Sequence, residues 1–126
     1  MTLAAPLVLI VEDEPLIREL AGVALSDAGF EILEAANAQE ALDILNSRGD
    51  VGVLCTDVNM PGPFDGYALA KIVHEQWPLI KLVVTSARAM PGPMPDHGKF
   101  VAKPYSLGVL AQTVAAVTDQ DDLDGR

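Results

Sequence analysis

The stretch Leu-Val-Leu-Ile-Val-Glu-Asp-Glu-Pro, residues 7–15, contains the features that decide the fold. Its first five residues are all apolar, as expected of a strand that is buried on both faces of a parallel sheet. Three acidic residues follow at once, and Pro15 then stands where the first turn of a helix tolerates a missing N–H. We therefore expect a strand over Leu7–Val11 that ends in an acidic turn and leads into a helix.

The same alternation of short apolar runs and helical patterns continues along the chain. Further strands are predicted over Glu31–Ala35, Val51–Thr56, Lys81–Thr85 and Lys99–Ala102. Apolar residues at three- and four-residue steps predict helices that end near Gly29, Gly49 and Pro78, and a last helix over Leu107–Val117. Asn37 followed by Glu40 is typical of a capping box at a helix start. This order predicts an α/β fold with helices on both faces of a parallel sheet.

One expected helix is missing from this alternation. The segment Ala87–Gly98 contains Pro91, Pro93 and Pro95, which make a long helix costly because each proline removes a backbone hydrogen bond. We expect a loop there, or one helical turn at most. The chain end is acidic and lacks an apolar period, so we expect one domain over residues 1–118 and a frayed acidic tail over 119–126.

Length and charge exclude several classes of protein. The 126 residues suit a single domain without a second, and 8 basic against 18 acidic residues give a net charge of −10. Such a surface repels nucleic acid and anionic membranes, so we expect neither as a partner. The single cysteine, Cys55, cannot form an internal disulfide, and no apolar stretch is long enough to span a bilayer. We expect a cytoplasmic protein.

Reactive polar residues follow several of the predicted strands. Glu12 and Asp13 follow the first, Asp57 the third, Ser86 the fourth and Lys103 the fifth. The carboxyl ends of parallel strands meet at one edge of a sheet, where ligands bind. Converging carboxylates repel one another unless a cation neutralises them, and carboxylate oxygens suit Mg²⁺. A lysine and a hydroxyl beside such a metal are what a transferred phosphoryl group needs.

These residues, in this order, resemble the receiver domain of bacterial two-component response regulators of the single-domain, CheY-like kind. The resemblance rests on the pair Glu12-Asp13, the run Asp57-Val58-Asn59-Met60-Pro61, Ser86 before Ala87, and Lys103-Pro104. It implies a flavodoxin-like, doubly wound, five-stranded parallel sheet of order 2-1-3-4-5. In this chain the fourth helix of that fold is expected to be shortened or replaced by the proline-rich loop.

The resemblance also implies a function and a set of site residues. Asp57 would accept a phosphoryl group from a sensor histidine kinase or histidine phosphotransfer protein, and the phosphorylated domain would dock on an unknown downstream protein. The implied metal ligands for Mg²⁺ are Glu12, Asp13, Asp57 and the backbone carbonyl of Asn59; the phosphoryl-stabilising and switch residues are Lys103, Ser86 and Phe100. The domain would act alone as a phospho-acceptor with at most slow self-dephosphorylation, and not as an enzyme.

Several alternatives stay open. Thr85 is a second candidate for the switch hydroxyl, although the strand end favours Ser86 at the sheet edge. The loop Met60–Gly66 is one residue longer than is usual for the family, so Pro63 or Phe64 would bulge. Without the family spacing, Phe100 is better explained as a core residue.

Two other functions compete with the phospho-acceptor. One is a Mg²⁺-dependent phosphohydrolase with an aspartyl-phosphate intermediate, but such enzymes place an acid–base carboxylate two residues after the nucleophile, where this chain has Asn59. The other is a receiver-like binding module that never carries phosphate. The retained set of mutually repelling carboxylates argues against that module.

Overall fold

The computed structural model describes residues 6–60, 62, 65–87, 92–93, 98–103 and 105–124, with side chains only as far as residue 118. Within these residues the elements follow in the order β1 (Leu7–Val11), α1 (Pro15–Asp27), β2 (Glu31–Ala35), α2 (Ala38–Ser47), β3 (Val51–Asp57), α3 (Gly66–Gln76), β4 (Lys81–Ser86), β5 (Lys99–Ala102) and α4 (Leu107–Asp124). In this described part of the chain, no helix is both long and apolar enough to cross a membrane.

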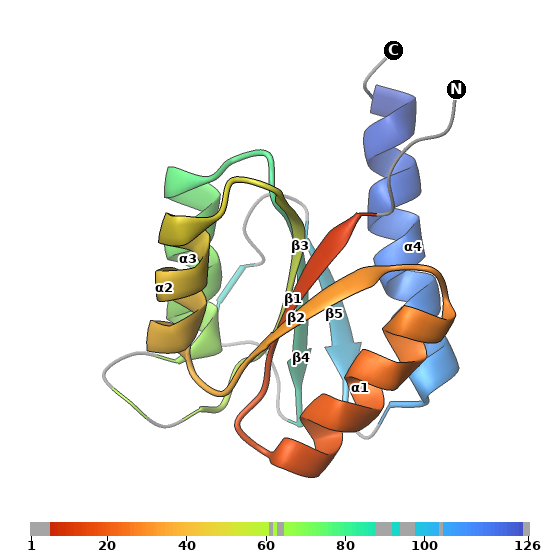
Figure 1. Cartoon of the computed structure of the whole chain (residues 1–126), viewed down its shortest axis with the longest axis horizontal. Helices are drawn as coiled ribbons and strands as arrows, with labels where there is room; N and C mark the ends of the chain where they lie inside the picture. Colours follow the sequence, from red (N-terminus) through yellow and green to blue (C-terminus); the bar gives the residue numbers. More distant parts are fainter. Residues whose placement is uncertain are drawn as a thin grey trace.

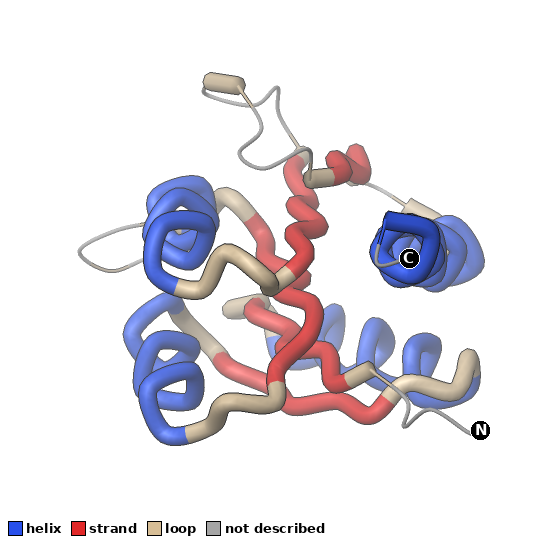
Figure 2. The backbone as a smooth tube through the Cα atoms, turned by 90° about the horizontal axis from the view of Figure 1, so that it is seen from above, coloured by secondary structure: helices blue, strands red, loops and turns tan. Residues whose placement is uncertain are grey.

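The strands form one parallel sheet of order β2-β1-β3-β4-β5. Helices α2 and α3 lie against one face, and α1 and α4 lie against the other (Figure 1). The same two layers are seen in the end-on view (Figure 2). This is the flavodoxin-like, doubly wound fold with the strand order expected from the sequence.

Alternate residues of the central strands divide the core into two halves. Leu9 and Leu54 point to the side of α2 and α3, whereas Val8 and Val53 point to the side of α1 and α4. All five residues of β1 are buried, so this strand packs on both faces, as its unbroken apolar run predicted. Each fully buried leucine or valine contributes about 2 kcal/mol by leaving water. The sheet is therefore packed on both faces, and this packing holds the carboxyl ends of its strands in place.

Local sequence signals explain where the helices begin and end. The side chain of Asn37 accepts a hydrogen bond from Glu40 N at 2.8 Å, while Glu40 Oε1 accepts from Ala36 N at 2.9 Å. These bonds satisfy backbone donors at the start of α2 and confirm the predicted cap. Gly29, which follows α1, has a φ of 100°, a conformation that glycine adopts without strain.

The structure differs from the sequence expectation at three places. Strands β3 and β4 each extend one residue further than predicted, to Asp57 and Ser86. The backbone of α4 is helical to Asp124, beyond the helix end expected at Val117, and the acidic tail over 119–126 stays a prediction. Neither proline nor glycine occurs between Gly108 and Gly125, and nothing in the sequence breaks the helix before its end.

The proline-rich segment is described only in part. Strand β5 is the next described element after β4, and residues 88–91 and 94–97 lie outside the described part of the chain. Pro93 is described, and its carbonyl oxygen accepts a hydrogen bond from Tyr67 Oη of α3 at 2.9 Å. Pro63 and Phe64, where a bulge was expected, also lie outside the described residues.

Candidate functional site

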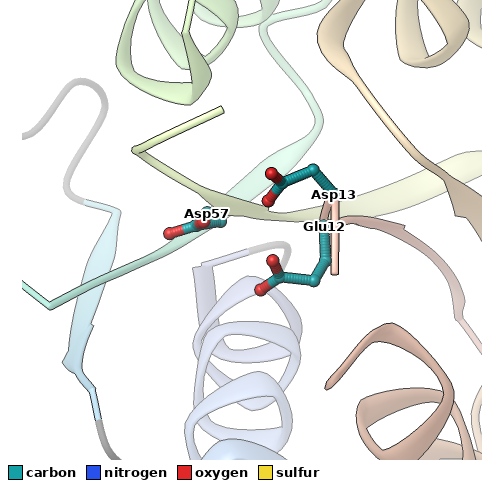
Figure 3. Close-up of side chains that lie close together, drawn as sticks. All are labelled: Glu12, Asp13 and Asp57. Atoms are coloured by element: carbon teal, nitrogen blue, oxygen red, sulfur yellow. The ribbon is translucent and has the colours of Figure 1, made fainter. Parts of the chain in front are cut away.

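Three carboxylates meet at the carboxyl edge of the sheet. Glu12 and Asp13 directly follow β1, and Asp57 is the last residue of β3. One ligand oxygen from each side chain can be chosen so that all three atoms lie within 4.8 Å of one another. In Figure 3 the Glu12 and Asp13 carboxyl groups extend from the end of β1 toward the side of Asp57. The structure thus brings together acidic residues that are 45 positions apart in the sequence.

Lys103 supplies the positive charge at this cluster. Its Nζ lies 2.8 Å from Glu12 Oε1, to which it donates a hydrogen bond, and 3.4 Å from Asp57 Oδ2. The three side chains are largely buried, with relative exposures of 16% for Lys103, 5% for Glu12 and 7% for Asp57. Lys103 directly follows β5, so the pairing depends on β1, β3 and β5 ending at the same edge.

Burial dominates the electrostatics of the cluster. It raises the pKa of Glu12, and the Asp57 charge raises it further, against the hydrogen bond from Lys103. Burial likewise raises the pKa of Asp57, against the charge and hydrogen bond of Lys103 and a hydrogen bond from the Asn59 backbone. For Lys103, burial acts to lower the pKa, but the hydrogen bond to Glu12 and the Asp57 charge outweigh it and raise the pKa. One lysine therefore neutralises these carboxylates incompletely.

The donor set fits a divalent cation. The three carboxylates and the one ammonium carry a formal net charge of −2, which one divalent ion cancels. The ligand atoms are carboxylate oxygens, which Mg²⁺ prefers, and among the residues that the structure describes no histidine or cysteine belongs to this cluster. The backbone carbonyl of Asn59 stays a predicted fourth ligand.

Ser86 ends β4, next to the loop that follows β3. The side-chain amide Nδ2 of Asn59 donates a hydrogen bond to Ser86 Oγ at 3.3 Å. Thr85 is one residue earlier in the strand, in register with Asp57. The Asn59 contact supports Ser86 as the switch hydroxyl, which stays a prediction.

Phe100 lies away from the core. It is 41% exposed on β5, in register with Val84, so the alternative that it is a core residue was wrong. The carboxylate cluster does not include it. Its role as a switch aromatic therefore still rests on the family spacing.

Gly66 is a site residue that the sequence patterns did not single out. It is the first residue of α3, and its N–H donates to the carbonyl of Val58 at 2.9 Å. A Cβ at this position would collide with the backbone carbonyl of Asp57. Only glycine lets α3 begin this close to the end of β3. The pair Asp65-Gly66 was the available signal, because Asp65 caps α3 by accepting from Ala68 N at 2.9 Å.

A cavity of about 360 Å³ opens beside Lys103, between the ends of α1 and α4. It is lined by Ile17, Leu20, Ala87, Lys103, Tyr105 and Leu107. Leu16 and Leu20 of α1 are 67% and 44% exposed. The cluster thus borders an apolar, accessible surface on the α1 side.

Comparison with known proteins gives a consistent match over most of the chain. Residues 8–115 match the family described as the response regulator receiver domain. The sensor kinase CckA of Brucella abortus is 37% identical over 122 residues, covering 91% of this chain but 13% of CckA. The response regulator protein FleR of Pseudomonas aeruginosa is 29% identical over 113 residues, covering 86% of this chain and 24% of FleR. This chain therefore spans a small part of these curated relatives.

Solved structures with the same fold are similar over nearly their whole length. The chemotaxis protein CheY4 of Vibrio cholerae has a TM-score of 0.81 at 28% identity, covering 90% of this chain and 99% of that one. The response regulator TrrA of Thermotoga maritima, solved in complex with Mg²⁺-BeF, has a TM-score of 0.79 at 28% identity, covering 88% of this chain and 97% of that one.

Proposed function

Because this chain belongs to the family of response regulator receiver domains, we propose that Asp57 accepts a phosphoryl group from a sensor histidine kinase or a histidine phosphotransfer protein. One observation carries the proposal: Asp57 is buried at the carboxyl edge of the sheet, where Lys103 Nζ lies 3.4 Å from its Oδ2 and the carboxylates of Glu12 and Asp13 are close by. A nucleophile, a cation and a set of metal ligands are thus assembled at one point.

The transfer is a displacement at phosphorus. An oxygen of the Asp57 carboxylate attacks the phosphorus of a donor phosphohistidine, a P–O bond forms and the P–N bond breaks, and the imidazole leaves with the bonding electrons and takes up a proton. Lys103 already lies 3.4 Å from Asp57 Oδ2, within reach of an oxygen of the incoming group. Its charge, fixed by the bond to Glu12, is in place before the reaction.

Glu12, Asp13 and Asp57 are the residues that would hold Mg²⁺, with the Asn59 carbonyl as the predicted addition. A bound Mg²⁺ supplies charge neutralisation to the phosphoryl oxygens. TrrA, crystallised with Mg²⁺-BeF, is a relative in which the metal and a fluoride complex occur together. The −2 charge of the cluster here is the feature that calls for such an ion.

The signal to a downstream protein would start from a change at the end of β4. Ser86 Oγ accepts a hydrogen bond from Asn59 before phosphorylation, and we expect it to turn toward a phosphoryl oxygen afterwards. The exposed Phe100 on the neighbouring strand would then turn inward, which changes the surface offered to a downstream protein. That this domain acts alone, and in the cytoplasm, remains a prediction from the sequence.

The donor has to reach the Asp57 side chain, which is only 7% exposed. The cavity beside Lys103 and the apolar side chains of α1 are the accessible surface next to it. We therefore place the approach of the donor on this side. The matched relative CckA is a sensor kinase, which agrees with a kinase as the phosphoryl source.

The proposal is tested by incubating the protein with Mg²⁺ and acetyl phosphate and measuring its intact mass over time. We expect one long-lived phosphoryl increment on the wild type and none on Asp57→Asn. Rapid turnover of acetyl phosphate would instead favour the phosphohydrolase, although Asn59 offers no acid–base carboxylate. No increment and no turnover would favour the binding module, and either result would overturn the proposal.

A further inference from the structure

Arg18 contacts the acidic turn from the neighbouring helix. It is the fourth residue of α1, and its Nη1 donates a hydrogen bond to the backbone carbonyl of Glu12 at 2.7 Å. Its Nε lies 3.3 Å from Glu34 Oε1 of β2, and the Arg18 side chain is only 20% exposed. The guanidinium therefore bridges the acidic turn and the edge strand, and it contacts no carboxylate of the metal cluster in the interactions described.

The hydrogen bond from Arg18 fixes the peptide group that joins Glu12 to Asp13. The backbone N–H of Glu12 donates to the Ala35 carbonyl at 3.1 Å, which holds the peptide plane before Glu12. The bond from Arg18 holds the carbonyl, and hence the planar peptide, that leads to Asp13. Both peptide planes around Glu12 are thus held, and the Cα of Asp13 is fixed with them.

A glycine in α1 makes room for the second half of this bridge. Gly22 lies one turn after Arg18 and is buried, although glycine in a helix interior lowers helix stability. A Cβ at position 22 would lie 3.1 Å from Glu34 Oε2 and 2.9 Å from Ile32 Cδ1. A larger residue would therefore crowd the carboxylate that orients Arg18.

We propose that Arg18 is a positioning residue of the metal site, which holds the Glu12–Asp13 peptide in the geometry that binds Mg²⁺. The inference rests on the proposed function, because it assumes that the carboxylate cluster binds the metal. Groups that orient ligands without touching the metal typically change its affinity by 10- to 100-fold when removed.

The sign of the effect separates positioning from simple electrostatics. Replacing Arg18 removes a positive charge near an acidic cluster, and charge alone would then make Mg²⁺ bind more tightly. Loss of positioning acts in the opposite direction. A weaker affinity in Arg18→Met therefore cannot arise from the charge change.

The test is isothermal titration calorimetry of Mg²⁺ into the unphosphorylated protein. We expect Arg18→Met to weaken the Mg²⁺ affinity about tenfold. Arg18→Lys keeps the charge but loses the planar fork that reaches both Glu12 and Glu34, so its affinity should lie between wild type and Arg18→Met. The matched control is Arg48→Met. Arg48 is an exposed arginine that pairs with Asp50 just before β3, at the amino ends of the strands. The Mg²⁺ affinity of this variant should stay near that of the wild type.

The thermal midpoint of each variant in EDTA shows whether it is folded at the titration temperature. If Arg18→Met does not fold, the Mg²⁺ affinity of Arg18→Lys tests the inference instead. Charge alone predicts that this variant binds Mg²⁺ as tightly as the wild type does. Wild-type or tighter binding by the folded Arg18 variants would overturn the inference and leave the proposed function intact. Absence of Mg²⁺ binding by the wild type would overturn the metal site itself, and the inference with it.

Discussion

Replacing Lys103 by methionine removes the only cation that contacts the buried carboxylates in the described structure. Nζ lies 2.8 Å from Glu12 Oε1 and 3.4 Å from Asp57 Oδ2. With an effective dielectric constant of about 20, these distances correspond to gross attractions of about 6 and 5 kcal/mol, which desolvation largely offsets. Removing one partner of a buried ion pair typically costs about 3–5 kcal/mol, because the other charge stays buried without compensation.

Protonation limits this loss. A carboxyl group with an ordinary pKa near 4 can be neutralised at a cost of about 1.4 kcal/mol per pH unit, which is about 4 kcal/mol at pH 7 and about 1.4 kcal/mol at pH 5. We therefore expect metal-free Lys103→Met to lose about 3 kcal/mol of unfolding free energy at pH 7, and only about 1 kcal/mol at pH 5.

The assay is urea denaturation in EDTA at both pH values, with Lys99→Met as the control. Lys99 is an exposed lysine of β5, four residues before Lys103, and its replacement should cost little at either pH. A loss in Lys103→Met that does not change between pH 7 and pH 5 would refute the reasoning. So would a variant as stable as the wild type.

Three further predictions concern stability. Because burial raises the pKa values of Glu12 and Asp57, the metal-free wild type should lose unfolding free energy as the pH rises from the unfolded pKa values near 4 through the raised folded values. Urea denaturation in EDTA should show this decline, and the decline should be smaller in Asp57→Asn. An unfolding free energy that rises with pH would contradict the prediction. Gly66→Ala should lower the unfolding free energy by about 3 kcal/mol, because the added methyl group would collide with the Asp57 carbonyl. The control Gly49→Ala should change it by less than about 0.5 kcal/mol, because no atom lies within 4 Å of a Cβ at that position. Equal thermal midpoints of the two variants would count against the collision. Asn37→Ala should cost about 1 kcal/mol through loss of the cap on α2, and an unchanged urea midpoint would exclude that contribution.

The central strand β1 could be predicted to the residue because its environment leaves little choice. A parallel strand covered on both faces must be apolar at every position, and Leu7–Val11 is buried throughout. The ends of β3 and β4 were predicted one residue too early, because their last residues are polar. Asp57 and Ser86 look like loop residues by type, but they are strand residues whose polar groups are buried in the site.

The convergence of the site residues followed from topology, but their pairing did not. That Glu12, Asp57 and Lys103 share one edge is a consequence of parallel strands. That Lys103 bonds Glu12 more closely than Asp57 depends on side-chain geometry across 91 residues of sequence, which no local pattern encodes.

The contributions of Gly66 and Arg18 were hidden for a related reason. Both act on the backbone of an acidic residue and not on its side chain. A sequence motif records which side chains carry the chemistry, but it does not record which neighbours hold their peptides in place. The three-dimensional arrangement was needed to recognise these two residues.

The central claim is that Asp57 carries the phosphoryl group, and locating the group on the chain tests it most directly. After incubation with Mg²⁺ and acetyl phosphate, borohydride reduction converts an aspartyl phosphate to homoserine, which peptide mass spectrometry locates. The account predicts homoserine at position 57 alone. Homoserine at position 13, or phosphate on a serine or histidine with position 57 unchanged, would contradict it.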